Sequence, residues 1–276
     1  MSARITKADG TTELFQPEKL RSSLERAGAT PGRAGEITKD MEKEIYDGIT
    51  TNEIYRHAFA SLKEEHHAAA ARYSLKRAIL DFGPSGFPFE AYLAELFRAE
   101  GYSAKIDQII PGRCVDHEVD VVMIRENKTT YVEAKFHNTA ALKSDLKTVL
   151  YVQARLEDIA AHKGNPEHMN GLIATNTKFT SKAVQYGVCA GIELLSWEYP
   201  LNHTLHDRID RAKVYPITAL TTLSRDEKIS LLNEKIVLCT GLPLQSEALQ
   251  RSGVHGKRAD AIFKEAAELC VLGKDI

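Results

Sequence analysis

The sequence predicts an α/β protein built from three parts, and three observations lead to this prediction. Helical periodicity dominates residues 17–82, and strand-like and helical segments alternate between residues 103 and 197. From residue 214 onward the pattern is one of short helices alone. The chain has 276 residues, 43% of them hydrophobic, which is enough for more than one packed core. We therefore expect domains at residues 1–83, 84–213 and 214–276.

The first part opens with a predicted β-hairpin. Strand-forming residues flank Asp9-Gly10 in ITKADGTTELF, and Asp-Gly between two such runs favours a tight turn. Helical patterns follow, with Pro17 suited to a first helical turn and Thr51 suited to an N-cap. We expect helices at residues 17–27, 35–47, 51–63 and 68–82.

The second part is predicted to be an α/β sandwich. Glycine and proline are concentrated between Gly83 and Pro88, which is typical of a connection between independently packed units. Beyond this connection, helical and strand-like patterns alternate. The helices are expected at residues 89–100, 142–161 and 181–190, and the strands at 103–110, 118–124, 130–135, 171–174 and 192–197.

The third part is predicted to contain short helices at residues 225–238, 246–251 and 258–269. Between the last two lies Gly253-Val254-His255-Gly256, and the segment from Ser246 to Ile262 resembles a helix-hairpin-helix unit. In such a unit the Gly-x-x-Gly turn presents backbone amides to a DNA phosphate. The alternative is a helical subdomain that serves packing or dimerisation.

Composition limits the classes of function. A net charge of -2 gives no overall attraction for nucleic acid, so DNA binding would need local basic patches or bound metal. The longest apolar runs are too short to span a bilayer and the start lacks a signal peptide, so we expect a cytoplasmic protein. Four scattered cysteines without a CxxC pair indicate reduced thiols rather than a zinc cluster or disulfides.

A group of charged residues on two predicted strands is the candidate for chemistry. Glu133 and Lys135 are two apart in Tyr131-Val132-Glu133-Ala134-Lys135, so both project from one face of their strand. Asp120 precedes the apolar run Val121 to Ile124 and begins a neighbouring strand, which we expect to pair with the first as a hairpin. Two carboxylates and one ammonium group would then converge.

This combination suits the hydrolysis of phosphodiester bonds. Asp120 and Glu133 would provide oxygen ligands for Mg²⁺ or Mn²⁺, while Lys135 would orient or deprotonate the attacking water and stabilise developing charge. The residues alone are explained equally well by a solvated surface strand, because Glu-x-Lys occurs there by chance.

The order of motifs around these residues resembles a known family. Residues 86–200 are similar to the Mrr branch of the PD-(D/E)xK restriction-endonuclease superfamily. The similarity includes Phe89-Glu90, Val119-Asp120, Val132 to Lys135, Gly171 to Asn176 and Gly191 to Leu195. It implies a restriction-endonuclease-like α/β/α sandwich that cleaves DNA with Asp120, Glu133 and Lys135, and a metal site supported by Glu90. One departure is Ala134, where Mrr proteins often have cysteine.

Other polar residues near this group can each have one of two roles. His117 and Glu118 could provide a second metal contact, or they could be solvated residues at the end of a strand. Four lysines could contact DNA phosphate, or they could lie on solvated helix faces. These lysines are Lys143, Lys147, Lys178 and Lys182.

The first 82 residues contain a second candidate site. A lysine-bearing hairpin beside a helix N-terminus can provide donors for phosphates, and Lys7 and Lys19 have this placement. The run from Ile5 to Gly10, the segment Tyr46 to Ile49 and Ala70-Ala71-Arg72-Tyr73 together resemble the ATP-cone domain of ribonucleotide reductases and their transcriptional repressor. The resemblance implies that ATP or dATP binds to Ile5, Lys7, Glu13, Gln16, Lys19 and Thr51.

One residue departs from the ATP-cone pattern. The family usually has Lys-Arg where this chain has Lys7-Ala8, so one positive charge for the phosphates is missing. Loss of a charge-assisted contact costs ~1.5–3 kcal/mol, which is one to two decades in affinity. Weaker triphosphate binding or an altered nucleotide preference would follow.

The sequence thus predicts an endonuclease that responds to nucleotide and cleaves DNA with Mg²⁺ under the control of ATP or dATP. Duplex DNA is the expected substrate, and cleavage of both strands would favour a dimer that brings two sites together. The alternative is a non-catalytic regulator that senses nucleotide and binds nucleic acid, with the nuclease fold serving only as a platform.

Overall fold

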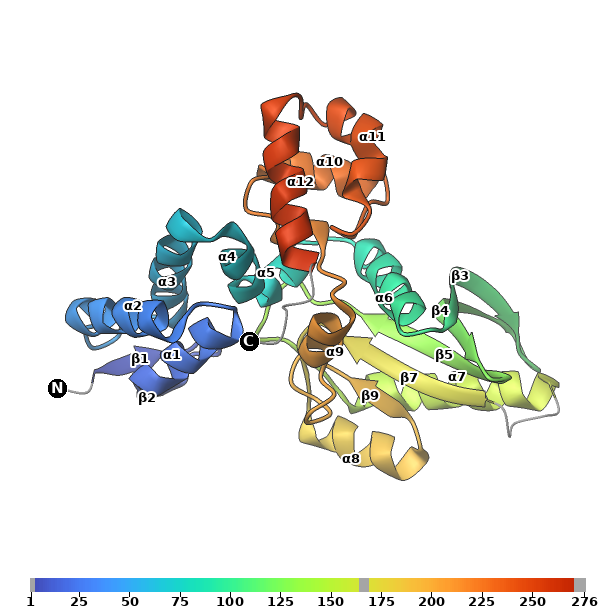
Figure 1. The fold of residues 1–276 in the computed structure, drawn as a ribbon. Coiled ribbons are helices and arrows are strands. Elements are labelled where there is room, and N and C mark those ends of the chain that lie inside the picture. The colour runs from blue at the N-terminus through green and yellow to red at the C-terminus, as the bar shows by residue number, and fades with distance from the viewer. Residues whose placement is uncertain (1–2, 164–168, 271–276) are drawn as a thin grey trace.

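The structure is a computed structural model that describes residues 3–163 and 169–270. Figure 1 shows three groups of elements: the blue hairpin and helices, the green and yellow sheet with its helices, and the orange and red helices near the carboxyl end. Among the described residues, no helix is long and apolar enough to cross a membrane.

The predicted hairpin and the helices behind it are present, with three corrections. The second helix spans residues 31–44 instead of the expected 35–47. The third helix is capped by Thr50, not Thr51, because the Thr50 hydroxyl accepts from the Glu53 backbone while Glu53 bonds back to Thr50. The expected helix at residues 68–82 is interrupted at Ser74. The elements are β1 (Arg4–Thr6), β2 (Thr12–Leu14), α1 (Pro17–Arg26), α2 (Pro31–Glu44), α3 (Thr51–Glu65), α4 (His67–Tyr73) and α5 (Leu75–Leu80).

A five-stranded sheet forms the centre of the second part, in the order β3-β4-β5-β7-β9. The first three strands are antiparallel, and β5, β7 and β9 run parallel. Two short strands that were not predicted, β6 (Lys143–Ser144) and β8 (Lys178–Phe179), pair with each other. The five strands are β3 (Ser103–Pro111), β4 (Asp116–Arg125), β5 (Lys128–Lys135), β7 (Met169–Thr175) and β9 (Glu193–Leu195).

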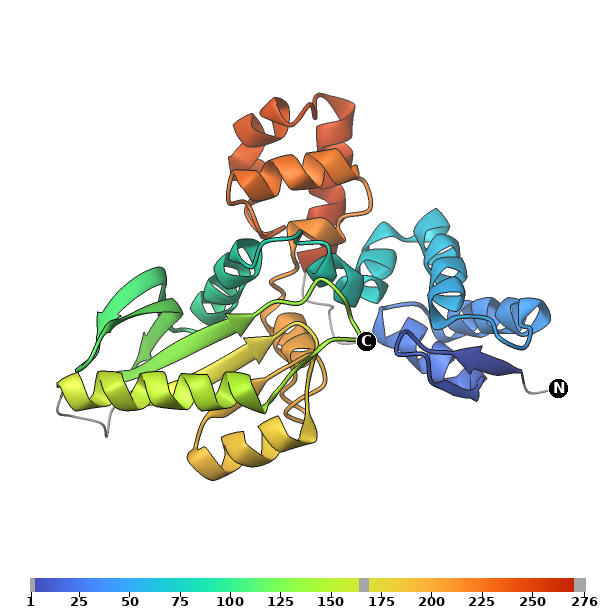
Figure 2. The same ribbon diagram turned by 180° about the vertical axis from the view of Figure 1, so that it is seen from behind.

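Helices cover both faces of this sheet, which confirms the restriction-endonuclease-like α/β/α sandwich. Val132 and Ala134 pack in the cluster that contains α6 (Phe87–Ala99) and α9 (Leu205–Ala212). Ile173 packs on the other face against α7 (Leu146–Lys163) and α8 (Ser181–Ala190). Figure 2 shows α7 lying along the sheet. Helix α9 was not predicted; the Thr204 capping box begins it and Leu205 and Ile209 bury one face.

The third part consists of η2 (Ile217–Ala219), α10 (Arg225–Asn233), η3 (Leu242–Gln245), α11 (Ser246–Arg251) and α12 (Lys257–Cys270). Helix α10 ends five residues before the expected position. Lys235 has a φ of 63°, and the backbone beyond it turns to bond with residues 215–217. Val237 accepts a 2.9 Å hydrogen bond from the Ile217 amide, and this long-range pairing replaces the helix.

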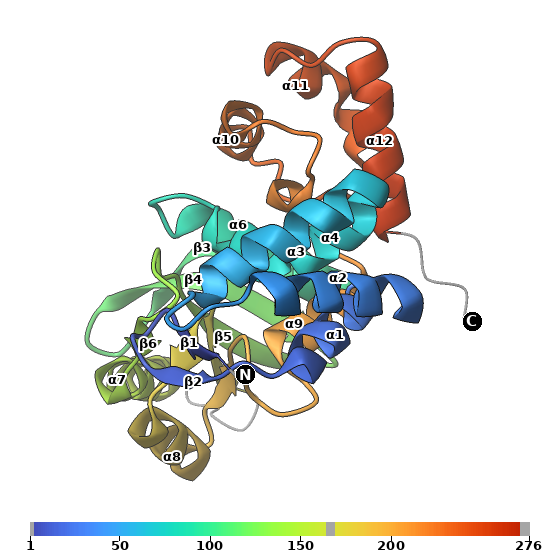
Figure 3. The same ribbon diagram turned by 90° about the vertical axis from the view of Figure 1, so that its left-hand side faces the viewer.

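The three parts share one buried cluster, and α5 and α6 lie at its centre. Thr218 donates a 2.7 Å hydrogen bond to the Ala78 carbonyl, and the Tyr92 hydroxyl donates one of 2.8 Å to the Val214 carbonyl. Figure 3 shows α12 beside α4, where Arg72 donates to the Glu268 carbonyl. The helices α1 to α3 have a separate core with the hairpin.

Candidate functional site

Asp120 lies where strands β4 and β5 separate. The last recorded pair of this ladder is Val121 with Val132, and one further step of the same register sets Asp120 opposite Glu133. The Ala134 amide donates a 2.6 Å hydrogen bond to Oδ2 of Asp120. A side-chain carboxylate thus takes the place of a backbone acceptor, and the ladder ends at this point.

A distortion of the neighbouring strand accompanies this arrangement. Asp107 of β3 is skipped by the ladder, between the pairs Ile106–Val121 and Gln108–Val119, and it has a φ of 52°, a left-handed conformation that costs a non-glycine residue ~1–2 kcal/mol. Val119 and Val121 would share one face in a regular strand, yet Val119 packs with Ile159 of α7 and Val121 packs in the α6 cluster. The sequence patterns did not indicate this change of face at Asp120.

Glu133 is held by an arginine that sequence reasoning missed. Nη1 of Arg155 donates to Oε2 of Glu133 at 2.7 Å, and Nη2 donates to the Tyr151 hydroxyl at 2.9 Å. Arg155 is buried at 8% exposure, and its Nε has no hydrogen-bond partner among the described residues. A charged residue at a buried position of an amphipathic helix is the one signal in the sequence that points to it.

Burial and like charge change the acidity of the carboxyl groups. Burial, followed by the charge of Glu133, raises the pKa of Asp120 to about 6, although the Ala134 hydrogen bond opposes this. Burial, followed by the charges of Asp120 and Asp107, raises the pKa of Glu90 to about 7. Glu90, in the first turn of α6, is therefore close enough to the two strand carboxylates for their negative charges to raise its pKa.

Lys135 is the last residue of β5 and is exposed. It follows Glu133 by two positions, as the alternation of the strand requires, and its register partner on β7 is Thr175. Within residues 3–163 and 169–270 it makes no ion pair, so its ammonium group is open to solvent or to an anion.

The two strand carboxylates can hold a divalent ion only as part of a small donor set. In the described part of the chain, no cluster of three or more His, Cys, Asp and Glu side chains is arranged to hold a metal. Hydrogen bonds engage Oδ2 of Asp120 and Oε2 of Glu133, which leaves Oδ1 and Oε1 for a ligand. Mg²⁺ keeps several waters and commonly uses one or two protein carboxylates together with substrate phosphates, so this donor set fits.

Among the other polar residues near Asp120, His117 has a local partner. Its Nε2 lies 2.9 Å from Oδ2 of Asp158 on α7, and the amides of Cys114 and Val115 donate to the same carboxylate. The hydrogen bond from His117 is the main cause that lowers the pKa of Asp158 to about 2. His117 thus ties the β3–β4 hairpin to α7, while Glu118 is exposed.

The four lysines predicted near phosphate lie in two settings. Lys143 and Lys178 are register partners in the small β6–β8 pair, and Lys178 also forms a 2.9 Å ion pair with Glu198. Lys147 and Lys182 are exposed near the starts of α7 and α8.

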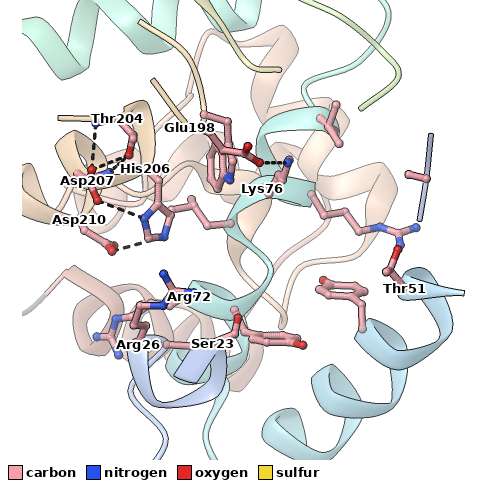
Figure 4. A pocket seen from close by; sticks show the side chains of 18 of the residues that line it. Ser23, Arg26, Thr51, Arg72, Lys76, Glu198, Thr204, His206, Asp207 and Asp210 are labelled. Atoms are coloured by element: carbon pink, nitrogen blue, oxygen red, sulfur yellow. Dashed lines mark hydrogen bonds and ion pairs between the residues drawn. The ribbon is translucent and has the colours of Figure 1, made fainter. Parts of the chain in front are cut away.

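The residues expected to bind nucleotide are brought together only in part. Glu13 accepts from Lys7 at 2.7 Å and lies 3.6 Å from Lys19, so the two ammonium groups share one carboxylate and the cluster keeps a net positive charge. Ile5 is buried in the core of the first part, and Gln16 is exposed at the N-cap of α1. Thr51 follows Thr50, which bridges to Thr6 of the hairpin, and it lines a cleft that reaches the nuclease-like part (Figure 4).

The predicted helix-hairpin-helix segment consists of α11 and α12 joined by a short turn. Gly253 and Gly256 have φ values of 90° and 53°, which a glycine adopts without strain. The nearby cation Arg258 is paired with Glu227. DNA binding by this turn stays a prediction.

Comparison with protein families identifies three successive matches. Residues 3–81 match the ATP cone domain, residues 84–198 match a restriction endonuclease family, and residues 215–270 match the family described as AF1548-like, C-terminal.

Two relatives each match about two thirds of this chain. An uncharacterized protein of Archaeoglobus fulgidus is 31% identical over 178 residues, which are 64% of this chain and 99% of the relative. The crystal structure of a protein of unknown function, AF1548, is 29% identical and superposes with a TM-score of 0.56 over 67% of this chain and 98% of its own.

Proposed function

This chain belongs to the family of the Archaeoglobus fulgidus protein, and we propose that it is a metal-dependent endonuclease acting on DNA. The proposal rests on the order of the chain's own domains, in which an ATP-cone domain precedes a restriction-endonuclease domain. We propose further that ATP or dATP bound to the ATP-cone domain controls the cleavage.

One observation carries the proposal for the nuclease: the register sets Asp120 opposite Glu133 where β4 separates from β5, and the charge of Glu133 acts on Asp120. The two carboxyl groups retain one unengaged oxygen each, and Lys135 extends from the same strand as Glu133. Two carboxylates repel an anionic substrate such as DNA. The site therefore suits DNA only if a bound cation, in addition to Lys135, offsets their negative charge.

The residues of the chain have distinct tasks in this proposal. Asp120 and Glu133 hold a Mg²⁺ or Mn²⁺ ion, and Glu90 supports the site from α6. When bound, the ion supplies Lewis-acid stabilisation of the charge that develops on the phosphate. Lys135 orients the attacking water and stabilises the negative charge of the transition state. Arg155 keeps the Glu133 carboxylate in one orientation.

Cleavage of DNA with and without these groups tests the proposal. The protein is incubated with plasmid and with linear DNA in Mg²⁺, in Mn²⁺ and in EDTA. Asp120→Asn keeps an oxygen that can accept from the Ala134 amide, and Lys135→Ala removes the ammonium group. Lys128→Ala, at the exposed other end of β5, is the matched control.

We expect metal-dependent cleavage that falls by about 100-fold or more in Asp120→Asn and Lys135→Ala and remains in Lys128→Ala. Cleavage that survives in both site variants would contradict the assignment of these residues. Addition of ATP or dATP to the same reactions tests the proposed control.

The Arg155–Glu133 ion pair favours a second candidate function. A guanidinium that already neutralises Glu133 reduces the need for a metal there, as in a regulator that binds nucleic acid without cleaving it. This candidate predicts DNA binding in a gel-shift assay, no cleavage with either metal ion, and no effect of Asp120→Asn on binding.

A further inference from the structure

Strand β5 loses its backbone partner directly after Lys135. The parallel ladder of β5 with β7 ends where Lys135 pairs with Thr175. The end of a strand frays where no partner holds it, and the position of its last side chain is then poorly fixed. The proposed reaction, however, needs the exposed Lys135 ammonium group at one place beside the phosphate. A group outside the ladder therefore has to hold the backbone that follows Lys135.

The side chain of Asn176 holds this backbone. Its Oδ1 accepts a 2.8 Å hydrogen bond from the backbone N–H of His137, and its Nδ2 donates one of 2.8 Å to the His137 carbonyl. A carboxamide offers a donor and an acceptor side by side, as a peptide group does, so Asn176 extends the ladder with a side chain in place of backbone. Asn176 is 1% exposed, and hydrogen bonds that are shielded from water are stronger than exposed ones.

Asn176 is itself fixed in a short buried turn. The backbone N–H of Thr177 donates to the Thr175 hydroxyl at 3.3 Å, and the Thr177 carbonyl accepts from the Trp197 backbone N–H at 3.2 Å. Thr175 and Thr177 are as buried as Asn176. The carboxamide is therefore presented from a rigid support, as a residue that positions another must be.

Two further contacts hold the same stretch of chain. The ring of Phe136 packs on that of Phe89 in α6, with centroids 5.7 Å apart. Nε2 of His137 lies 3.1 Å from the hydroxyl of Ser144, which is buried in β6. The backbone on the carboxyl side of Lys135 is thus fixed, while the exposed ammonium group is available to a substrate.

We propose that Asn176 is a positioning residue for Lys135 and acts by fixing the backbone of His137. The inference rests on the proposed cleavage of DNA and adds a residue that acts through Lys135 and not on the substrate. Without the carboxamide, His137 loses two hydrogen bonds, and the Lys135 ammonium group spreads over positions from which it cannot stabilise the transition state. The rate of the chemical step then falls, whereas binding of DNA is retained.

A double-mutant cycle in the full-length protein tests this role. Asn176→Ala and Lys135→Ala are made singly and together, and single-turnover cleavage of linear DNA in Mg²⁺ gives the rate of each variant. If Asn176 acts through Lys135, its loss has no further effect once the ammonium group is absent. Thr177→Val is the matched control, because Thr177 is equally buried in the same turn and its hydroxyl bonds to that of Thr175 instead of to His137.

We expect Asn176→Ala to lower the cleavage rate about 30-fold by itself and less than about 2-fold in the Lys135→Ala background. The DNA concentration that gives half the maximal rate should change by less than about 3-fold, because the contacts that bind DNA remain. Thr177→Val should keep the rate within about 2-fold of the wild type. Asn176→Asp keeps the size of the side chain and one acceptor, and it replaces Asn176→Ala in the cycle if the smaller side chain prevents folding.

Amide hydrogen exchange measures the hold on the backbone without any cleavage. We expect the amides of residues 136–138 to exchange about ten-fold or more faster in Asn176→Ala than in the wild type, while those of residues 130–134, within the ladder, keep their rates. Thr177→Val should leave both segments unchanged. A general loss of structure would instead speed exchange in both segments and would overturn the inference.

Two other results would also overturn the inference while the proposed nuclease stands. A fall in rate that is equally large with and without Lys135 would assign Asn176 a purely structural role. Unchanged exchange at residues 136–138 would show that Asn176 does not hold this backbone. A wild-type protein that cleaves DNA in neither Mg²⁺ nor Mn²⁺ would instead remove the proposed function, and with it any role of Asn176 in cleavage.

Discussion

Arg155 of α7 donates a 2.7 Å hydrogen bond to the Glu133 carboxylate of β5, and both side chains are largely shielded from solvent. The guanidinium also lies over the Tyr151 ring, 4.7 Å from its centroid, and bonds to the Tyr151 hydroxyl. The orientation of one candidate metal ligand therefore depends on a helix that follows it by more than ten residues in the chain.

Substitution of Arg155 tests whether it positions Glu133 for metal. We expect Arg155→Lys, which keeps the charge but loses the fixed two-pronged geometry, to raise the Mn²⁺ concentration for half-maximal cleavage about 10-fold. Tyr151→Phe keeps the ring and should produce a smaller shift. A metal requirement that falls in Arg155→Lys would show that the ion pair instead competes with the metal.

Glu265 of α12 is expected to be important for stability. Its carboxylate, at 2% exposure, accepts from the amides and hydroxyls of Thr221 and Thr222 at distances of 2.5–2.9 Å. Glu265→Ala leaves these donors without a partner, so we expect a loss of about 3 kcal/mol in the free energy of unfolding. Urea denaturation measures this loss, and Glu268→Ala on the same helix should change it little.

Stability at acidic pH should depend on Glu227. The hydrogen bond from Arg258, opposed by burial and aided by Ser224, lowers the pKa of Glu227 from 4.5 to about 2. A lowered folded-state pKa stabilises the protein fully above pH 4.5, and this contribution is lost as the pH falls towards 2.

Glu227→Gln should therefore be less stable than the wild type at pH 7 by about 1.5–3 kcal/mol, and the difference should shrink at pH 3. Denaturant midpoints at the two pH values provide the measurement. A difference that is equal at both would contradict the pKa assignment.

Gly112 is predicted to tolerate no side chain. An added Cβ would lie within 2.5 Å of the Val115 carbonyl oxygen and would collide with the Asp158 carboxylate. Gly112→Ala should therefore break the contacts that tie the β3–β4 hairpin to α7, with a destabilisation of about 1–3 kcal/mol. Thermal unfolding measures the effect, and Gly32→Ala, where nothing lies within 4 Å, is the control.

Local sequence was sufficient for most elements and for the first view of the site. Asp9-Gly10 predicted the hairpin, and the alternation of β5 was enough to set Glu133 and Lys135 two positions apart on one strand face. Helix ends were less predictable. Helix α10 stops early because residues 237–239 pair with residues 215–217, a contact that local periodicity does not encode.

The sequence by itself determined the order of the three parts, the elements within them and the identity of the candidate carboxylates, because these follow from periodicity, turn residues and ordered motifs. Only the tertiary structure decided that Arg155 would hold Glu133, that the strands would separate at Asp120, and that Asn176 would bond to the backbone of His137. Each of these depends on how separate elements pack. The contacts join residues that are far apart in the chain, so local sequence patterns do not reveal them.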